Sequence, residues 1–233
     1  MTKTYTGVLL IVGPILTILG YLLMPQNGFG KDPTDPASVV TGMAGNGAQI
    51  DIFLLMVALG MAALVGGIYL ANRQHAASDK EEDPRTTWGG LITIISFIGF
   101  ISTVGIIAAI SGTIDGTIEK AMAQGADAAA AGAAAGAAAG SIIALGSGIQ
   151  AYADIFFGIG IAVMASAWAQ GTVHDRNTSY VLAVVGVLTV LARVILGLTD
   201  AAGDTTAMVG SILYVIATIS FVSIGVQTLQ AKS

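Results

Sequence analysis

Six long runs of apolar residues, separated by segments that hold nearly all the charges, constrain the fold of this chain more than any other feature. The runs cover residues 7–24, 50–71, 88–110, 151–170, 179–198 and 207–226. The hydrocarbon core of a bilayer is roughly 30 Å thick, and about 20 apolar helical residues cross it. Because backbone groups in lipid must be hydrogen-bonded within their own segment, each run is expected to be a helix. We therefore predict an all-α, polytopic transmembrane helix bundle of about six spans, with residues 1–233 forming a single transmembrane domain.

The composition agrees with a membrane protein and excludes several other classes. Only 10% of the 233 residues are charged and 55% are hydrophobic, whereas a soluble domain carries about 25% charged residues. The formal net charge of −5 argues against nucleic acid as a partner, which requires a basic face. The chain has no cysteine, which excludes thiolate metal sites and cysteine nucleophiles. The first run lacks a small-residue cleavage site and is interpreted as a retained span.

The basic residues between the runs predict the orientation. Cytoplasmic loops carry an excess of Lys and Arg, and an inside N-terminus places six basic residues on the inner side and two on the outer side. The inner residues are Lys3, Arg73, Lys80, Arg85, Arg176 and Lys232, and the outer ones are Lys31 and Lys120. We therefore expect a multi-pass protein of the cell membrane with both termini cytoplasmic. Tyr and Trp fall near the predicted span ends, where both favour the interface, and only Tyr214 lies in the middle of a span.

Two outer segments are unusual. Residues 25–49 contain three prolines and are predicted to be an irregular exposed loop. Residues 122–140 are nearly all Ala and Gly, with Gly132, Gly136 and Gly140 four residues apart. This spacing fits close packing of two helices. We favour an outer segment without a specific task, such as a helical extension of the fourth span, and a re-entrant or disordered segment stays open.

Small residues also recur inside the runs. Gly13 and Gly20 lie seven apart in the first run, and Gly158, Ala162 and Ser166 are spaced by four in the fourth. Lipid provides no hydrophobic drive between helices, so close contact through small residues supplies the packing energy of membrane bundles. These positions are predicted to pack helices together.

Four ionisable residues lie inside or beside the runs at the predicted outer side. Arg193 lies five residues before the end of the fifth run, a depth of roughly 8 Å. Asp154 lies at a similar depth in the fourth run, Asp51 is at the start of the second, and Asp200 follows the fifth. A guanidinium in hydrocarbon costs roughly 2.5–3.5 kcal/mol on insertion scales and seeks a carboxylate or water. We predict that Arg193 pairs with Asp154, with Asp51 or Asp200 as the second candidate. A buried structural ion pair is the favoured interpretation, and an outer-facing solute pocket is the alternative.

The remaining polar residues predict no chemistry. His75 and His174 fall between runs and lack the spacing of a metal site, so solvated loop histidines are expected. Phosphate-binding, dinucleotide and nucleophile-elbow motifs are missing. We predict a protein that is not an enzyme, with no catalytic residue, no metal and no cofactor.

The first span and its surroundings resemble uncharacterised six-span prokaryotic membrane proteins of unknown function. The likeness rests on residues 7–13 (GVLLIVG), residues 20–25 (GYLLMP) and residues 157–160 (FGIG). The resemblance implies a six-span layout and carries over no activity and no functional residue.

These observations lead to one functional expectation and one alternative. We expect a structural or accessory subunit that packs through small-residue helix faces, with the lipid bilayer, other membrane subunits or itself as partners, as in an oligomer. The alternative is a small transporter or channel with an outer-facing polar pocket.

Overall fold

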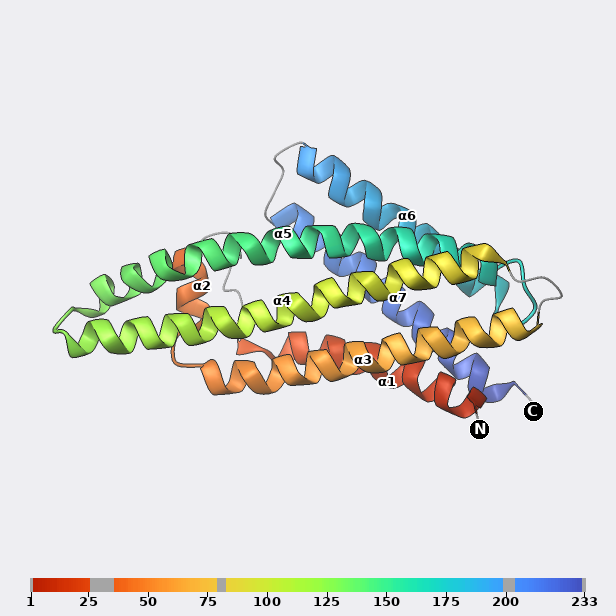
Figure 1. Cartoon of the computed structure of the whole chain (residues 1–233), viewed down its shortest axis with the longest axis horizontal. Coiled ribbons are helices and arrows are strands. Elements are labelled where there is room, and N and C mark those ends of the chain that lie inside the picture. The colour runs from red at the N-terminus through yellow and green to blue at the C-terminus, as the bar shows by residue number, and fades with distance from the viewer. Residues whose placement is uncertain (1, 26–35, 79–82, 199–203, 232–233) are drawn as a thin grey trace. The chain divides into compact units, whose positions relative to one another are not determined.

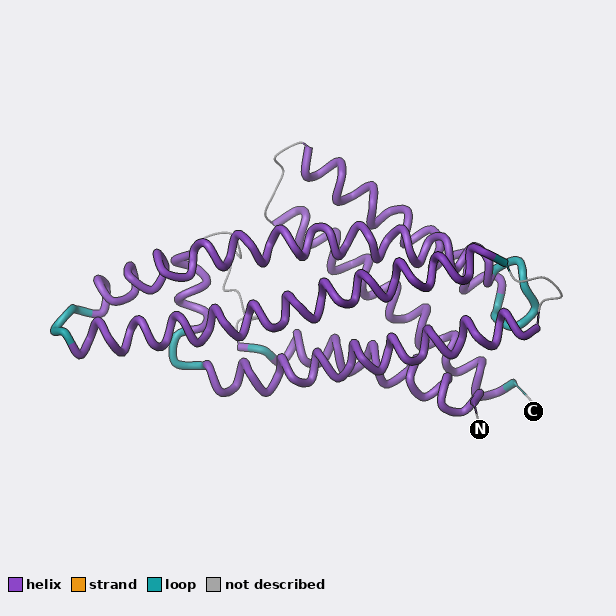
Figure 2. The backbone as a smooth tube through the Cα atoms, in the orientation of Figure 1, coloured by secondary structure: helices purple, strands orange, loops and turns teal. Residues whose placement is uncertain are grey.

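The computed structural model describes residues 2–25, 36–78, 83–198 and 204–231. All regular structure in these residues is helical, as Figure 2 shows. The helices, labelled in Figure 1, are α1 (Thr2–Leu23), α2 (Pro36–Met43), α3 (Gly47–Ser78), α4 (Pro84–Ala123), α5 (Ala128–Trp168), α6 (Arg176–Leu198) and α7 (Asp204–Gln230).

Six of the described helices are long and apolar enough to cross a membrane, and α2 is the exception. This confirms the predicted all-α fold with six spans. By helix length and hydropathy, the chain is a multi-pass integral membrane protein.

Aspartate side chains set the start of three helices. Asp83 Oδ1 accepts from the backbone N–H of Arg85 at 2.9 Å, Asp127 Oδ1 from Ala130 at 2.7 Å, and Asp175 Oδ2 from Thr178 at 2.7 Å. Each carboxylate thereby binds one of the N–H groups that the first helical turn leaves without a backbone partner. These caps fix the starts of α4, α5 and α6, respectively.

Helices α4 and α5 are much longer than a membrane span. They contain 40 and 41 residues, or about 60 Å each at 1.5 Å per residue, which is twice the thickness of the hydrocarbon core. The turn between them follows Ala123 and includes Gly125 at a φ of 85°, a left-handed conformation that favours glycine. The Ala/Gly tract is thus helical from Ala128 onward and continues without a break into the predicted fourth span.

The described contacts group the chain into two compact units. Unit 1 contains Met1–Thr17, Leu59–Gly99 and Ala151–Ser233, and unit 2 contains Ile18–Ala58 and Phe100–Gln150. The prediction of a single transmembrane domain stays a prediction beside this division.

In unit 1, helix backbones touch at glycine residues. A Cβ atom on Gly89 of α4 would lie 2.9 Å from the Gly160 carbonyl oxygen of α5, and one on Gly158 would lie 2.7 Å from the Gly186 carbonyl oxygen of α6. A Cβ on Gly13 of α1 would meet the α3 backbone at 2.5 Å. Contacts this short admit only glycine, so small residues allow the close helix packing that membrane bundles depend on.

Unit 2 contains α2, which corrects the prediction of an irregular loop over residues 25–49. Pro36 begins this helix, a position where proline's missing N–H is not needed, and Val39 and Met43 are fully buried. The turn after α2 is held by the backbone N–H of Gly45, which donates to Asp115 Oδ1 of α4 at 3.0 Å. Residues 26–35 lie outside the described part of the chain.

The tract in unit 2 packs through alanine. Ala131, Ala135 and Ala139 are fully buried, whereas a Cβ atom on Gly132 would meet no described atom within 4 Å. No close contact within the described chain therefore supports the packing role predicted for Gly132. For Gly136 and Gly140 that role stays a prediction. Gly20 fits the predicted packing role, because a Cβ atom on Gly20 would lie 2.9 Å from the Phe53 carbonyl oxygen of α3.

Candidate functional site

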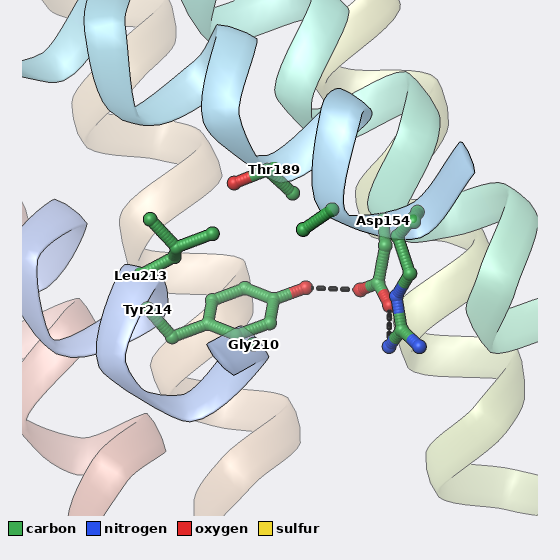
Figure 3. A pocket seen from close by; sticks show the side chains of 7 residues that line it. Asp154, Thr189, Gly210, Leu213 and Tyr214 are labelled. Carbon is green, nitrogen blue, oxygen red and sulfur yellow. Dashed lines mark hydrogen bonds and ion pairs between the residues drawn. The ribbon is translucent and has the colours of Figure 1, made fainter. Parts of the chain in front are cut away.

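Three helices of unit 1 bring one acid, one base and one phenol together. Asp154 of α5 is 1% exposed, and its Oδ2 atom forms an ion pair with Nη2 of Arg193 from α6. The Tyr214 hydroxyl of α7 donates a hydrogen bond to Asp154 Oδ1, as Figure 3 shows. We call Asp154, Arg193 and Tyr214 the Asp154 cluster. The pairing of Arg193 with Asp154 is the one that the sequence predicted.

The partners of Asp154 explain how a carboxylate can lie inside a membrane bundle. An ionised group in hydrocarbon is costly unless it is paired and hydrogen-bonded. Here each carboxylate oxygen faces one polar partner, and the Arg193 side chain keeps 25% of its surface exposed. The guanidinium therefore pairs with Asp154 while part of the Arg193 side chain reaches the surface of unit 1.

The cluster borders a cavity of about 10 Å³ that Thr189 and Leu213 also line. A cavity needs about 10–15 Å³ to hold one water molecule. The site therefore has room for a single water and no larger solute. The Thr189 hydroxyl donates to the Val185 carbonyl of its own helix at 2.8 Å, so its proton is directed away from the cavity.

The sequence did not predict Tyr214 as part of this site. Its ring stacks on Phe157 of α5 with centroids 5.6 Å apart and an interplanar angle of 27°. The rings of Phe97 of α4 and Phe157 form a T-shaped pair with centroids 5.8 Å apart. These aromatic contacts hold the phenol against Asp154. The signal was its position, since Tyr214 is the aromatic polar residue that lies away from the span ends and therefore needs a buried partner.

The two other predicted acids are not part of the described cluster. Asp51 is an exposed residue of α3 in unit 2, and Asp200 lies outside the described residues. A pocket that joins Asp51 or Asp200 to Arg193 therefore stays a prediction.

A second polar cluster lies in unit 1, where α3 ends and α5 is followed by the segment 169–175. The fully buried Trp168 donates from Nε1 to Asn72 Oδ1 at 2.9 Å. The His174 ring lies 4.6 Å from the Trp168 ring and is stacked with His75, the centroids 6.1 Å apart. We call Asn72, Trp168, His174 and His75 the His174 cluster.

The burial of both histidines corrects the prediction that they are solvated loop residues. His75 is 1% exposed and His174 is 6% exposed. The prediction failed because α3 continues to Ser78, which keeps His75 on a helix, and because the segment after α5 folds back over it. The pKa of His174 is lowered to about 4, chiefly by burial and also by the nearby His75, while a hydrogen bond with the Ala71 backbone acts in the opposite direction. His174 is thus neutral at physiological pH.

The described residues include no group of three or more His, Cys, Asp or Glu side chains that could hold a metal ion. The absence of a metal, a cofactor and a catalytic residue stays a prediction. What the Asp154 cluster can do chemically is hold one water or exchange one proton beside a fixed ion pair.

No protein-family model, no curated protein and no solved structure matches this chain. Of the resemblance noted in the first span, only the layout of a multi-span membrane protein is therefore supported, and no family is identified.

Proposed function

We propose that this integral membrane protein is a structural or accessory subunit, not an enzyme, which packs against itself or other membrane subunits through small residues. The observation that carries the proposal is an exposed face of α5 in unit 2 that consists of alanine alone. The face contains Ala129, Ala130, Ala133, Ala134, Ala137 and Ala138. Their spacing by three and by four places them side by side on the helix.

The length of α5 indicates that the alanine face lies outside the hydrocarbon core. A 41-residue helix is about 60 Å long, so when its apolar C-terminal half spans the roughly 30 Å core, the alanine half extends beyond it. Methyl-only side chains allow another helix to approach closely. A continuous apolar face outside the lipid is typical of a surface that contacts protein.

A charge placed on the alanine face tests the proposal. Ala134→Lys keeps a good helix former on an exposed position and should abolish the fixed-ratio complex or homo-oligomer that gentle extraction preserves. Ala123→Lys, on an exposed residue at the end of α4, is the matched control and should retain it. Native mass spectrometry of the protein from its own membrane measures both. A lone chain in the unmodified protein, or equal retention in both variants, would contradict the proposal.

The alternative of a small transporter or channel has weaker support. Its polar pocket would be the cavity at the Asp154 cluster, which accommodates one water. A solute or ion that raises the melting temperature of the purified protein, with the effect lost in Asp154→Asn, would favour this alternative over the accessory role.

We also propose that both termini face the cytoplasm, on the strength of the Lys and Arg distribution. Because the chain has no cysteine of its own, a single introduced cysteine reports its side without background. An impermeant thiol reagent should label Ser38→Cys in intact cells and label Ser78→Cys only after the cells are opened. The reverse pattern would invert the proposed topology.

A further inference from the structure

An apolar groove runs along the outside of α5 and α6 in unit 1. Ala162 and Ser166 of α5 form one wall, and Ala183, Val184 and Leu188 of α6 form the other. Its volume is about 290 Å³, against about 10 Å³ for the cavity at Asp154. From Tyr180, which lines one end, to Leu188 the groove extends about 12 Å along α6 at 1.5 Å per residue. Small residues of α5 line the depression, which lies between two helices that are long and apolar enough to cross a membrane.

A cation lies at one end of this groove. The guanidinium carbon of Arg176, the first residue of α6, is 5.5 Å from the centroid of the Tyr180 ring. Arg176 is exposed and lies where the predicted span begins, so it is at the depth of the lipid headgroups. The tyrosine ring thus links the charge to the apolar groove.

The neighbouring acid does not neutralise Arg176 through a direct pair. Asp175 Oδ2 accepts from the backbone N–H of Thr178 at 2.7 Å and from its hydroxyl at 2.8 Å. These two hydrogen bonds lower the pKa of Asp175 and hold its carboxylate at the start of α6. The Arg176 guanidinium carries a planar fork of N–H donors, a geometry that binds a phosphate in bidentate fashion.

We propose that this groove binds a glycerophospholipid with an anionic headgroup, whose phosphate lies at Arg176 and one of whose acyl chains lies between α5 and α6. The cation at the headgroup end and the apolar floor below it match the two parts of such a lipid. The inference is independent of the proposed accessory role, because the groove consists of residues of unit 1 and the alanine face consists of residues of unit 2.

Two matched pairs of variants test the site. Arg176→Gln removes the cation, and Arg73→Gln removes another exposed cation from α3 in the same unit. Ala183→Phe fills the groove, and Val181→Phe enlarges an exposed α6 residue that does not line it. Lipid binding is measured by native mass spectrometry while phosphatidylglycerol or phosphatidylcholine with the same acyl chains is added to the detergent-solubilised protein. Melting temperatures establish that each variant is folded.

The unmodified protein should bind phosphatidylglycerol about fivefold more tightly than phosphatidylcholine, the effect expected of one basic residue near the membrane surface. Arg176→Gln should reduce that preference to none and Arg73→Gln should keep it. Ala183→Phe should weaken binding of both lipids, and Val181→Phe should weaken neither. Equal preference in the two arginine variants, or unchanged binding in Ala183→Phe, would overturn the proposal. A dimer that Ala183→Phe dissociates would also overturn it, because a second copy would then occupy the groove.

Discussion

The two polar clusters of unit 1 bury their polar groups in opposite ways. The Asp154 cluster keeps a carboxylate and a guanidinium, with Asp154 almost fully buried and Arg193 partly exposed. In the His174 cluster, burial holds His174 neutral, and Trp168 and Asn72 are joined by a neutral hydrogen bond. The comparison indicates that Arg193, reaching Asp154 from a neighbouring helix, lets the buried acid keep its charge, whereas burial makes His174 neutral.

The largest expected effect is the loss of the ion pair. Arg193→Leu leaves the Asp154 carboxylate buried without its counter-charge and should lower the free energy of unfolding by about 3 kcal/mol. Unfolding by sodium dodecyl sulfate in mixed micelles measures it. The same substitution in an Asp154→Asn background should cost at least about 1 kcal/mol less, because the unpaired charge is then gone. Additive losses in this double-mutant cycle would show that the two residues do not interact energetically.

The next effect is a dependence on pH that the His174 cluster should produce between pH 6.5 and about 4. The pKa of His174 is lowered from 6.5 to about 4 in the folded protein, so the unfolded chain binds more protons between these values. The free energy of unfolding should be highest above pH 6.5 and fall as the pH decreases, by ~3 kcal/mol once the pH is below 4. Parallel titrations of the unmodified protein and His174→Gln measure it. An equal slope in His174→Gln would assign the dependence to other groups.

A smaller effect is expected for the phenol of the Asp154 cluster. Tyr214→Phe removes a hydrogen bond to a carboxylate, a type that contributes about 1.5–3 kcal/mol. Tyr152→Phe on α5 is the control, because Tyr152 is 69% exposed and its change should be near zero. If both variants unfold at the same detergent fraction, the bond between Tyr214 and Asp154 does not stabilise the fold.

The smallest effect is expected for the neutral hydrogen bond of the His174 cluster. Trp168→Phe keeps a buried aromatic ring but leaves Asn72 Oδ1 without its indole donor, at a cost of about 1 kcal/mol. The chain's other tryptophan is the control, since Trp88 is 64% exposed and Trp88→Phe should cost less than half as much. A larger loss for Trp168→Phe than for Tyr214→Phe would reverse the comparison between the charged and the neutral cluster.

The six spans could be predicted because a helix that crosses lipid requires a long run of residues without charge. The ends of the helices could not be found in this way, since helix hydrogen bonds continue beyond the lipid wherever the local sequence allows it. Thus α4 and α5 extend far past the apolar runs at 88–110 and 151–170. Asp83, Asp127 and Asp175 are residues of the type that begins helices, but a prediction from hydropathy alone does not use them.

The candidate site was predictable only as far as one pair. Asp154 and Arg193 stand out because an ionisable residue inside a span needs a partner. Tyr214 is visible only as an exception to the interfacial position of tyrosine. His174 gives no signal, because its burial depends on contacts that include His75, which is distant in sequence. The Ala/Gly tract shows the same limit, since the sequence marked only its glycines, whereas the described fold buries Ala131, Ala135 and Ala139 together with Gly136.

Because the backbones of α5 and α6 touch at Gly158 and Gly186, every single-base change in these two codons that is not silent enlarges the side chain or ends the chain. The alanine face around Ala133 and Ala134 has no such restriction from within the described chain. A single helix therefore joins a stretch that mutation can hardly alter to one that can drift freely. We expect saturation mutagenesis of α5 to reveal this gradient, unless a binding partner restricts the alanine face as well.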